Sequence, residues 1–136
     1  MFRATHIDHV EIYVADIAAA AKWYGKVFGL KEVLRWDPEP VMIGVGNNKL
    51  ALFKANAPRG DYQKKAHLEG NDAPHWHRVA WHTDVAGFTE AQHHLKTLGI
   101  VFRGPIDHRL SESIYFNDPD GNPLEITYYK NQSSAG

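Results

Sequence analysis

Three residues near the end of the chain have the chemistry to hold a divalent metal and to act beside it. His108, Tyr115 and Glu125 stand around an Asp-Pro-Asp-Gly turn at residues 118–121. Imidazole and carboxylate groups bind divalent transition metals, and a phenol or a second imidazole can move protons beside a bound substrate. Because Cys is absent, any metal site in this chain must be built from His and carboxylates.

Strand alternation predicts which of these side chains share a face. Residues 111–116 and 123–129 have the pattern of strands whose apolar positions face a helix: Ile114, Phe116, Leu124 and Ile126. Tyr115 and Glu125 then face the side away from the helix. In the first predicted strand, residues 9–14, His9 also faces away from the helix. Ionisable groups in the concavity of a curved sheet are costly unless they are paired or bind a metal. For Glu125 the structural alternative is a salt bridge with Arg78.

Both halves of the chain show the same order of predicted elements. In the first half, a strand precedes a helix that Asp16 caps and Gly29 ends, and three strands follow: 9–14, then 30–36, 41–45 and 49–54. In the second half, Asp84 caps the helix and Gly99 ends it, and the predicted strands are 79–83, 101–103, 111–116 and 123–129. Each half is therefore a β-α-β-β-β module. The predicted class is α+β, with two modules forming a curved, partly open mixed β-barrel and the helices outside.

Composition predicts one domain over residues 1–136, since 136 residues that are 43% hydrophobic can bury a sizeable core. We divide it into a first module (about 6–54), a linking loop (55–74), a second module (about 75–129) and a tail (130–136). The net charge of −1 offers no basic field for nucleic acid or an anionic membrane. No apolar run approaches the length needed to cross a membrane, so we expect a cytoplasmic protein.

The two modules and their motifs resemble the vicinal oxygen chelate superfamily, which includes glyoxalase I, fosfomycin-resistance and bleomycin-resistance proteins and extradiol dioxygenases. The motifs are the opening Ile7-Asp-His-Val-Glu-Ile-Tyr-Val14 and the closing Tyr115-Phe-Asn-Asp-Pro-Asp-Gly-Asn-Pro-Leu-Glu125. The resemblance covers residues 6 to about 129. From Ile106 to Glu125 the chain is similar to the signature of type I extradiol dioxygenases.

The resemblance implies roles for four residues. His9 and Glu125 match metal ligands of the family, and His108 and Tyr115 match catalytic residues that stand beside the metal. Two His and one carboxylate on one face of an ion leave positions open for a substrate that binds through two oxygens. Fe²⁺ or Mn²⁺ is the expected metal, with Zn²⁺, Ni²⁺ or Co²⁺ as alternatives. A small-molecule substrate and a homodimer are also implied.

The third ligand is ambiguous in the sequence. By distance to the helix cap, His77 to Asp84 matches His9 to Asp16, which makes His77 the ligand. By apolar alternation, Val79 faces the helix and Arg78 takes the ligand position, where a guanidinium cannot bind a cation. A one-residue slip reverses every side chain, so both registers cannot hold without a bulge. His75 and His82 are weaker candidates, and His93 and His94 are predicted to face solvent.

Three functions follow from these alternatives. The first is a metal-dependent oxygenase similar to extradiol ring-cleaving dioxygenases, acting on a catechol-like substrate. The second is another metal-dependent lyase, isomerase or transferase of the superfamily; residues 49–54 offer no carboxylate for the four-ligand site of glyoxalase I. The third is a metal-free small-molecule-binding protein similar to bleomycin-resistance proteins, in which Arg78 pairs with Glu125 or holds an anionic ligand.

Overall fold

A computed structural model describes residues 1–3, 5–55 and 78–130. The chain divides into two compact units, Met1–Ala73 and Pro74–Gly136, and each is described here by itself. Most of the predicted linking loop (55–74), the tail, His75 and His77 lie outside the described residues.

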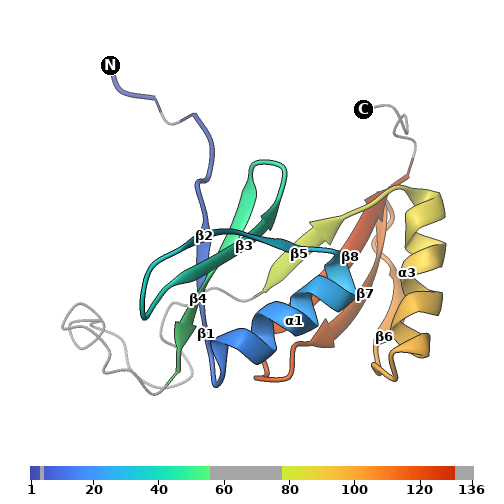
Figure 1. Cartoon of the computed structure of the whole chain (residues 1–136). Helices are drawn as coiled ribbons and strands as arrows, with labels where there is room; N and C mark the ends of the chain where they lie inside the picture. Colours follow the sequence, from blue (N-terminus) through green and yellow to red (C-terminus); the bar gives the residue numbers. More distant parts are fainter. Residues whose placement is uncertain (4, 56–77, 131–136) are drawn as a thin grey trace, which may run out of the picture. The chain divides into compact units, whose positions relative to one another are not determined.

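The first unit is a four-stranded mixed sheet with one helix (Figure 1). Its elements are β1 (Val10–Val14), α1 (Ile17–Phe28), β2 (Lys31–Arg35), β3 (Val41–Val45) and β4 (Asn48–Lys54). The strand order is β1-β4-β3-β2; β1 runs parallel to β4, and the other pairs are antiparallel. Helix α1 contacts β4 and β2 of this sheet.

Capping residues set the ends of α1 where the sequence predicts them. The Asp16 carboxylate accepts a hydrogen bond from the Ala19 N–H at 2.9 Å, which satisfies one free donor of the first turn. Gly29 has φ of 71°, a left-handed conformation, and its N–H donates to the Gly25 carbonyl. Both predicted ends of this helix are therefore confirmed.

The second unit repeats the arrangement of the first. Its elements are β5 (Val79–His82), α3 (Val85–Thr97), β6 (Arg103–Asp107), β7 (Ser111–Asn117) and β8 (Pro123–Tyr129), and its strand order is β5-β8-β7-β6. Asp84 caps α3 by accepting from the Gly87 N–H at 2.7 Å, and Gly99 follows its end with φ of 73°. Helix α3 contacts β8.

Strand β6 differs from the sequence prediction, which placed it at 101–103. The strand begins at Arg103 and continues through Gly104 and Pro105 to Asp107. Gly104 has φ of 111°, and the pairing with β7 shifts between Arg103 and Ile106, so this stretch is an irregular strand. The predicted strand ended before Gly104 and Pro105, because neither glycine nor proline fits the interior of a regular strand.

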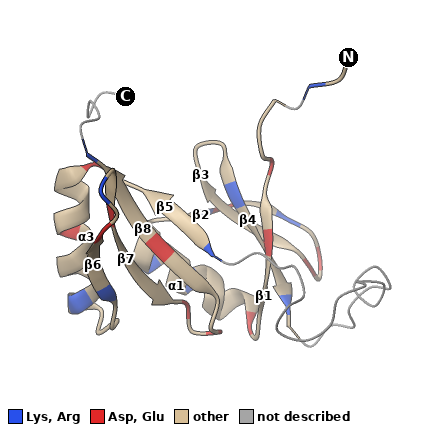
Figure 2. Cartoon of the chain, turned by 180° about the vertical axis from the view of Figure 1, so that it is seen from behind, with Lys and Arg blue, Asp and Glu red and all other residues tan. Residues whose placement is uncertain are grey.

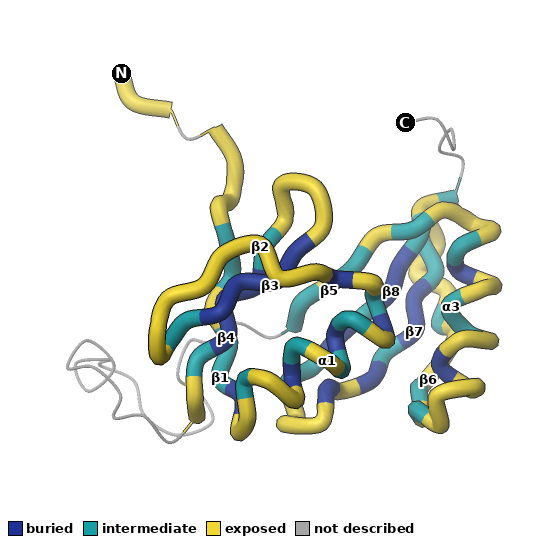
Figure 3. The backbone as a smooth tube through the Cα atoms, viewed as in Figure 1, coloured by how far each residue is buried: buried dark blue, intermediate teal, exposed yellow. Residues whose placement is uncertain are grey.

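Each unit has its own core: consecutive residues of β3 and β4 are buried in the first unit, and the second unit follows the predicted alternation in β7 and β8. In the first unit β3 and β4 hold most of the buried strand positions, whereas all of β2 is exposed (Figure 3). In the second unit the helix-facing positions of β7 and β8 are buried as predicted: Ile114, Phe116, Leu124 and Ile126. This assignment leaves Tyr115 and Glu125 on the opposite face of the sheet.

The predicted α+β class with two β-α-β-β-β modules is confirmed. Within the described residues the strands form two separate four-stranded sheets, which are not closed into one barrel. Neither described helix is long and apolar enough to cross a membrane.

Candidate functional site

The register of the second sheet brings the predicted functional residues into adjacent positions. Strands β7 and β8 pair antiparallel with Tyr115 opposite Glu125 and Ser113 opposite Thr127. Strand β5 lies parallel to β8 on the other side, with Ala80 opposite Glu125. Side chains directly opposite each other on neighbouring strands share a face of the sheet. Strand β8 lies between β5 and β7 (Figure 2), and its acidic residue, Glu125, therefore has neighbours from both strands on this face.

A buried hydroxyl network orients the Glu125 carboxylate. The fully buried Ser113 hydroxyl donates to Glu125 Oε2 at 2.7 Å, and its oxygen lies 2.9 Å from Thr127 Oγ1. The Thr127 hydroxyl in turn donates to the Glu112 carbonyl at 3.1 Å. Among the described residues, the other carboxylate oxygen, Oε1, has no hydrogen-bond partner. An oriented carboxylate with one oxygen free suits a metal ligand.

His108 and Tyr115 form the close pair that a proton-transfer role requires. His108 Nε2 lies 2.5 Å from the Tyr115 hydroxyl, within hydrogen-bonding distance. The hairpin between β6 and β7 holds His108 because its backbone N–H donates to the Ser111 carbonyl at 2.8 Å. Either group can donate in this hydrogen bond, because the phenol carries an O–H and the imidazole nitrogen donates or accepts according to the tautomer.

Arg78 lies on the same face as Tyr115. Its guanidinium carbon is 4.4 Å from the centroid of the Tyr115 ring, and that of Arg103 is 5.0 Å from the same centroid. This placement agrees with apolar alternation in β5, where Val79 is less exposed than Ala80. The described ion pairs include none between Arg78 and Glu125. The salt bridge that the sequence offered as an alternative role for Glu125 is therefore not formed. His77 lies outside the described residues, and its ligand role stays a prediction.

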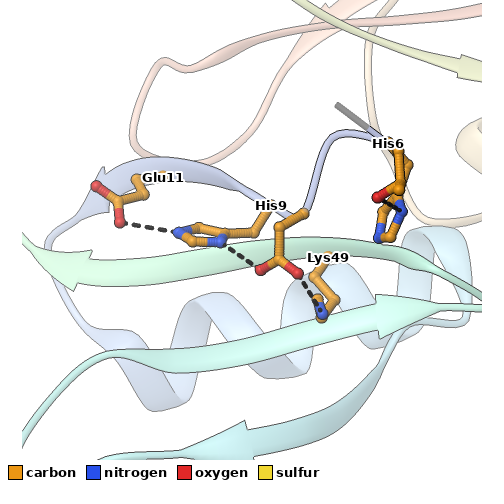
Figure 4. Close-up of polar contacts among 6 residues, drawn as sticks. His6, His9, Glu11 and Lys49 are labelled. Atoms are coloured by element: carbon orange, nitrogen blue, oxygen red, sulfur yellow. Dashed lines mark hydrogen bonds and ion pairs between the residues drawn. The ribbon is translucent and has the colours of Figure 1, made fainter. Parts of the chain in front are cut away.

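His9, at the start of the first unit, is held between two carboxylates (Figure 4). Its Nδ1 lies 2.8 Å from Asp8 Oδ2 and its Nε2 lies 3.0 Å from Glu11 Oε2. Lys49 completes the cluster with its Nζ 3.3 Å from Asp8 Oδ1. The hydrogen bond with Asp8, followed by that with Glu11, raises the pKa of His9 above its ordinary value. Imidazolium is therefore favoured, and His9 must lose a proton to bind a metal.

The donor groups fit the metal that the family resemblance implies. A carboxylate on one nitrogen of an imidazole is the usual support of a His ligand, and Asp8 provides it for His9 Nδ1. His9 Nε2 would be the nitrogen that could hold a metal, and its present partner is the Glu11 carboxylate. Within the described residues of either unit, no three His, Asp or Glu side chains are already grouped as a metal site.

The remaining histidines have other surroundings. His82 stacks on Tyr129, with ring centroids 6.2 Å apart. His93 and His94 are exposed on α3, as predicted. His75 lies outside the described residues. None of these observations gives His82 a ligand role.

The sequence did not indicate the contacts of two residues on this face, Ser113 and Arg103. Alternation already turned Ser113 toward Tyr115 and Glu125, but nothing in the sequence indicated that its hydroxyl holds the carboxylate. Arg103 was missed because β6 was predicted to end where it in fact begins. Its pairing with Tyr115 depends on that strand position.

Comparisons with known proteins agree with the fold and the motifs. The family model of the Glyoxalase/Bleomycin resistance protein/Dioxygenase superfamily matches residues 6–126. A solved structure from the mobile metagenome of V. Pseudocholerae is 26% identical, with 96% of this chain and 99% of that chain covered and a TM-score of 0.72.

One named enzyme and one resistance protein are also similar. Lactoylglutathione lyase from Agrobacterium tumefaciens is 25% identical, with 92% of this chain and 94% of that chain covered and a TM-score of 0.69. The fosfomycin resistance protein FosX from Listeria monocytogenes shares the fold at 13% identity, with 91% of each chain covered and a TM-score of 0.68. Because the family model covers most of the sequence, the chain belongs to the Glyoxalase/Bleomycin resistance protein/Dioxygenase superfamily.

Proposed function

We propose that this chain is a metal-dependent enzyme that binds a small molecule through two neighbouring oxygen atoms. His9, His77 and Glu125 are the proposed ligands. The observation that carries the proposal is the row formed by Glu125, oriented by Ser113, and Tyr115, hydrogen-bonded to His108. A carboxylate ligand beside a paired phenol and imidazole is suited to substrate activation with proton transfer.

Each residue around the proposed ligands has a separate role in the proposed reaction. A bound divalent ion would supply Lewis acidity and a template for two substrate oxygens. Tyr115 is placed to donate its hydroxyl proton to a substrate oxygen that gains negative charge. His108, at 2.5 Å from that hydroxyl, can return the proton to Tyr115 or accept it. Ser113 keeps Glu125 oriented throughout because its own side chain is fully buried.

We propose oxidative ring cleavage of a catechol-like diol as the reaction. Support comes from the stretch between Ile106 and Glu125, which is similar to the extradiol signature and holds the His108–Tyr115 pair. Turnover of catechol should consume O₂, measured with an oxygen electrode, and should stop under argon. Turnover that continues without O₂ would instead assign a lyase, isomerase or transferase reaction, as the 25% identity with a lactoylglutathione lyase suggests.

A metal-free binding protein is the second candidate. Arg78 on the Tyr115 face favours it, because a guanidinium close to the ligand positions opposes a bound cation. Metal analysis of protein purified without a His tag separates the two candidates. Stoichiometric Fe, Mn, Zn, Ni or Co supports the enzyme, whereas tight binding of a small molecule by metal-free protein supports the second candidate.

A further inference from the structure

Two arginines flank Tyr115 on the candidate site face without a described acidic partner. Arg103 lies directly opposite Tyr115 in the pairing of β6 with β7. Arg78 immediately precedes β5, beyond Ala80, which is opposite Glu125. Both guanidinium carbons lie within 5.0 Å of the Tyr115 ring centroid. The two positive groups therefore converge on one aromatic ring from different strands.

Neither arginine side chain forms an ion pair with a described residue. The ion pairs in the described part of the chain involve Arg35, Lys49, Lys130 and His9, and neither Arg78 nor Arg103 is among them. Arg78 Nε is buried and has no hydrogen-bond partner among the described residues. Cation–π contact with Tyr115 stabilises the positive charge but leaves the N–H groups free. A buried N–H without an acceptor in the described protein can donate to an atom of a ligand.

The net charge of the side chains on this face is positive, which favours binding of an anion. Two guanidinium groups, which stay ionised at all physiological pH values, stand against one carboxylate, Glu125, whose described partner is Ser113. A divalent ion held by Glu125 would add further positive charge. An oxyanion is the complementary group, because the planar guanidinium fork matches two oxygens of a carboxylate or phosphate.

We propose that Arg78 and Arg103 bind an oxyanion of the substrate, a carboxylate or a phosphate, beside the Tyr115–His108 pair. This deepens the proposed function, because it makes the substrate an anionic molecule rather than a neutral diol. It rests on the proposed function only for the identity of that molecule. The oxyanion site itself needs no metal, since its contacts come from the two arginines.

The test compares ligands that differ by one charged group. Calorimetry measures binding of 3,4-dihydroxybenzoate, catechol, benzoate and inorganic phosphate to the full-length protein as purified. We expect 3,4-dihydroxybenzoate to bind at least about ten-fold more tightly than catechol, because a bidentate charge-assisted contact is added. Competition by benzoate or by phosphate then distinguishes a planar from a tetrahedral oxyanion.

Substitutions test whether the two arginines cause the preference for 3,4-dihydroxybenzoate. Arg78→Gln and Arg103→Gln should each remove most of the preference for 3,4-dihydroxybenzoate over catechol, measured as the ratio of the two dissociation constants in each variant. Arg78→Lys keeps the charge but loses the fork, so it should retain part of the preference and guards against loss of folding. Arg35→Gln is the matched control, because Arg35 is already paired with Glu32.

The outcomes for the two proposals are distinct. Equal binding of catechol and 3,4-dihydroxybenzoate by the wild type overturns the oxyanion site and leaves the proposed function standing. Binding of benzoate or phosphate that depends on Arg78, with no binding of either diol, supports the oxyanion site and counts against the proposed diol substrate. An unchanged preference in both Gln variants shows that the anion binds elsewhere and overturns the proposal.

Discussion

At the scale of single residues, the second sheet holds one carboxylate in a defined orientation. Glu125 owes this to Ser113, whose hydroxyl reaches it from the neighbouring strand at 2.7 Å. Supporting hydrogen bonds of this kind fix the geometry of metal ligands and contribute strongly to affinity. Glu125 is the proposed metal ligand, and its orientation depends on Ser113, which is not itself a proposed ligand.

Substitution of Ser113 tests this support. Ser113→Ala removes the hydrogen bond and should lower metal affinity by about 10- to 100-fold, the usual effect of losing a group that supports a ligand. Ser113→Thr keeps the hydroxyl and serves as the graded variant. Metal affinity is measured by competition with a chromogenic chelator. Equal affinities of Ser113→Ala and the wild type would show that Ser113 does not support the ligand.

His9 gives a prediction on pH in the metal-free protein. Because the pKa of His9 is raised in the fold, its imidazolium stabilises the native state fully below the ordinary value of about 6.5. This contribution is lost as pH rises through the folded pKa, and it stays within about 1 kcal/mol because both carboxylate partners of His9 are exposed. Asp8→Asn should lower the pKa of His9 more than Glu11→Gln does, since Asp8 has the larger effect. Proton NMR titration of the ring measures both, and a wild-type His9 that titrates at or below 6.5 contradicts the account.

At the scale of elements, β6 determines which residues reach the site face. Arg103 reaches Tyr115 only because the strand begins there and then bends through Gly104. A Cβ on Gly104 would lie 2.7 Å from the Ser113 carbonyl oxygen and 3.0 Å from the Ile106 nitrogen. The close approach of β6 to β7 therefore requires glycine at this position.

Replacing this glycine should be costly. Gly104→Ala should reduce the free energy of unfolding by about 1–3 kcal/mol or more, since positive φ and a backbone clash act together. Gly99→Ala is the control, because Gly99 also has positive φ but its Cβ would meet no atom within 4 Å. Urea unfolding compares the two variants, and a smaller loss for Gly104→Ala than for Gly99→Ala would contradict the proposed clash.

Elements with local signals could be predicted, and those that depend on distant contacts could not. Asp16, Asp84 and Gly29 mark helix ends by chemistry within a few residues, and each acts as predicted. Strand β6 was misplaced because a Gly-Pro pair breaks local patterns, whereas pairing with β7 decides the outcome. Alternation gave the faces of Tyr115 and Glu125, but the hydroxyl network and the Arg78–Tyr115 contact depend on cross-strand packing.

At the scale of the whole molecule, the two modules have the same topology but different polar faces. The first unit contributes the Asp8–His9–Glu11 cluster, and the second contributes the row around Glu125. Acidic and basic residues are interspersed along both units (Figure 2), in keeping with a net charge of −1. The repeated topology therefore fixes the scaffold of each module but not its polar residues.

We predict that the chain functions as a homodimer, as proteins of this superfamily often do. Sedimentation velocity should give a species of twice the chain mass of 15.4 kDa. The ratio of dimer to monomer should fall on dilution, because association depends on concentration. A species with the mass of one chain at all concentrations tested would exclude the dimer.

The central claim is that Glu125 is a ligand of a divalent metal. The direct measurement is the metal content of untagged protein after dialysis against Fe²⁺ or Mn²⁺ and removal of free ion, compared with Glu125→Gln. The wild type should hold about one equivalent per chain and the variant, which keeps the shape but loses the charge, well under half of that. Less than about a tenth of an equivalent of any divalent transition metal in the wild type, or equal contents in the two proteins, would contradict the account.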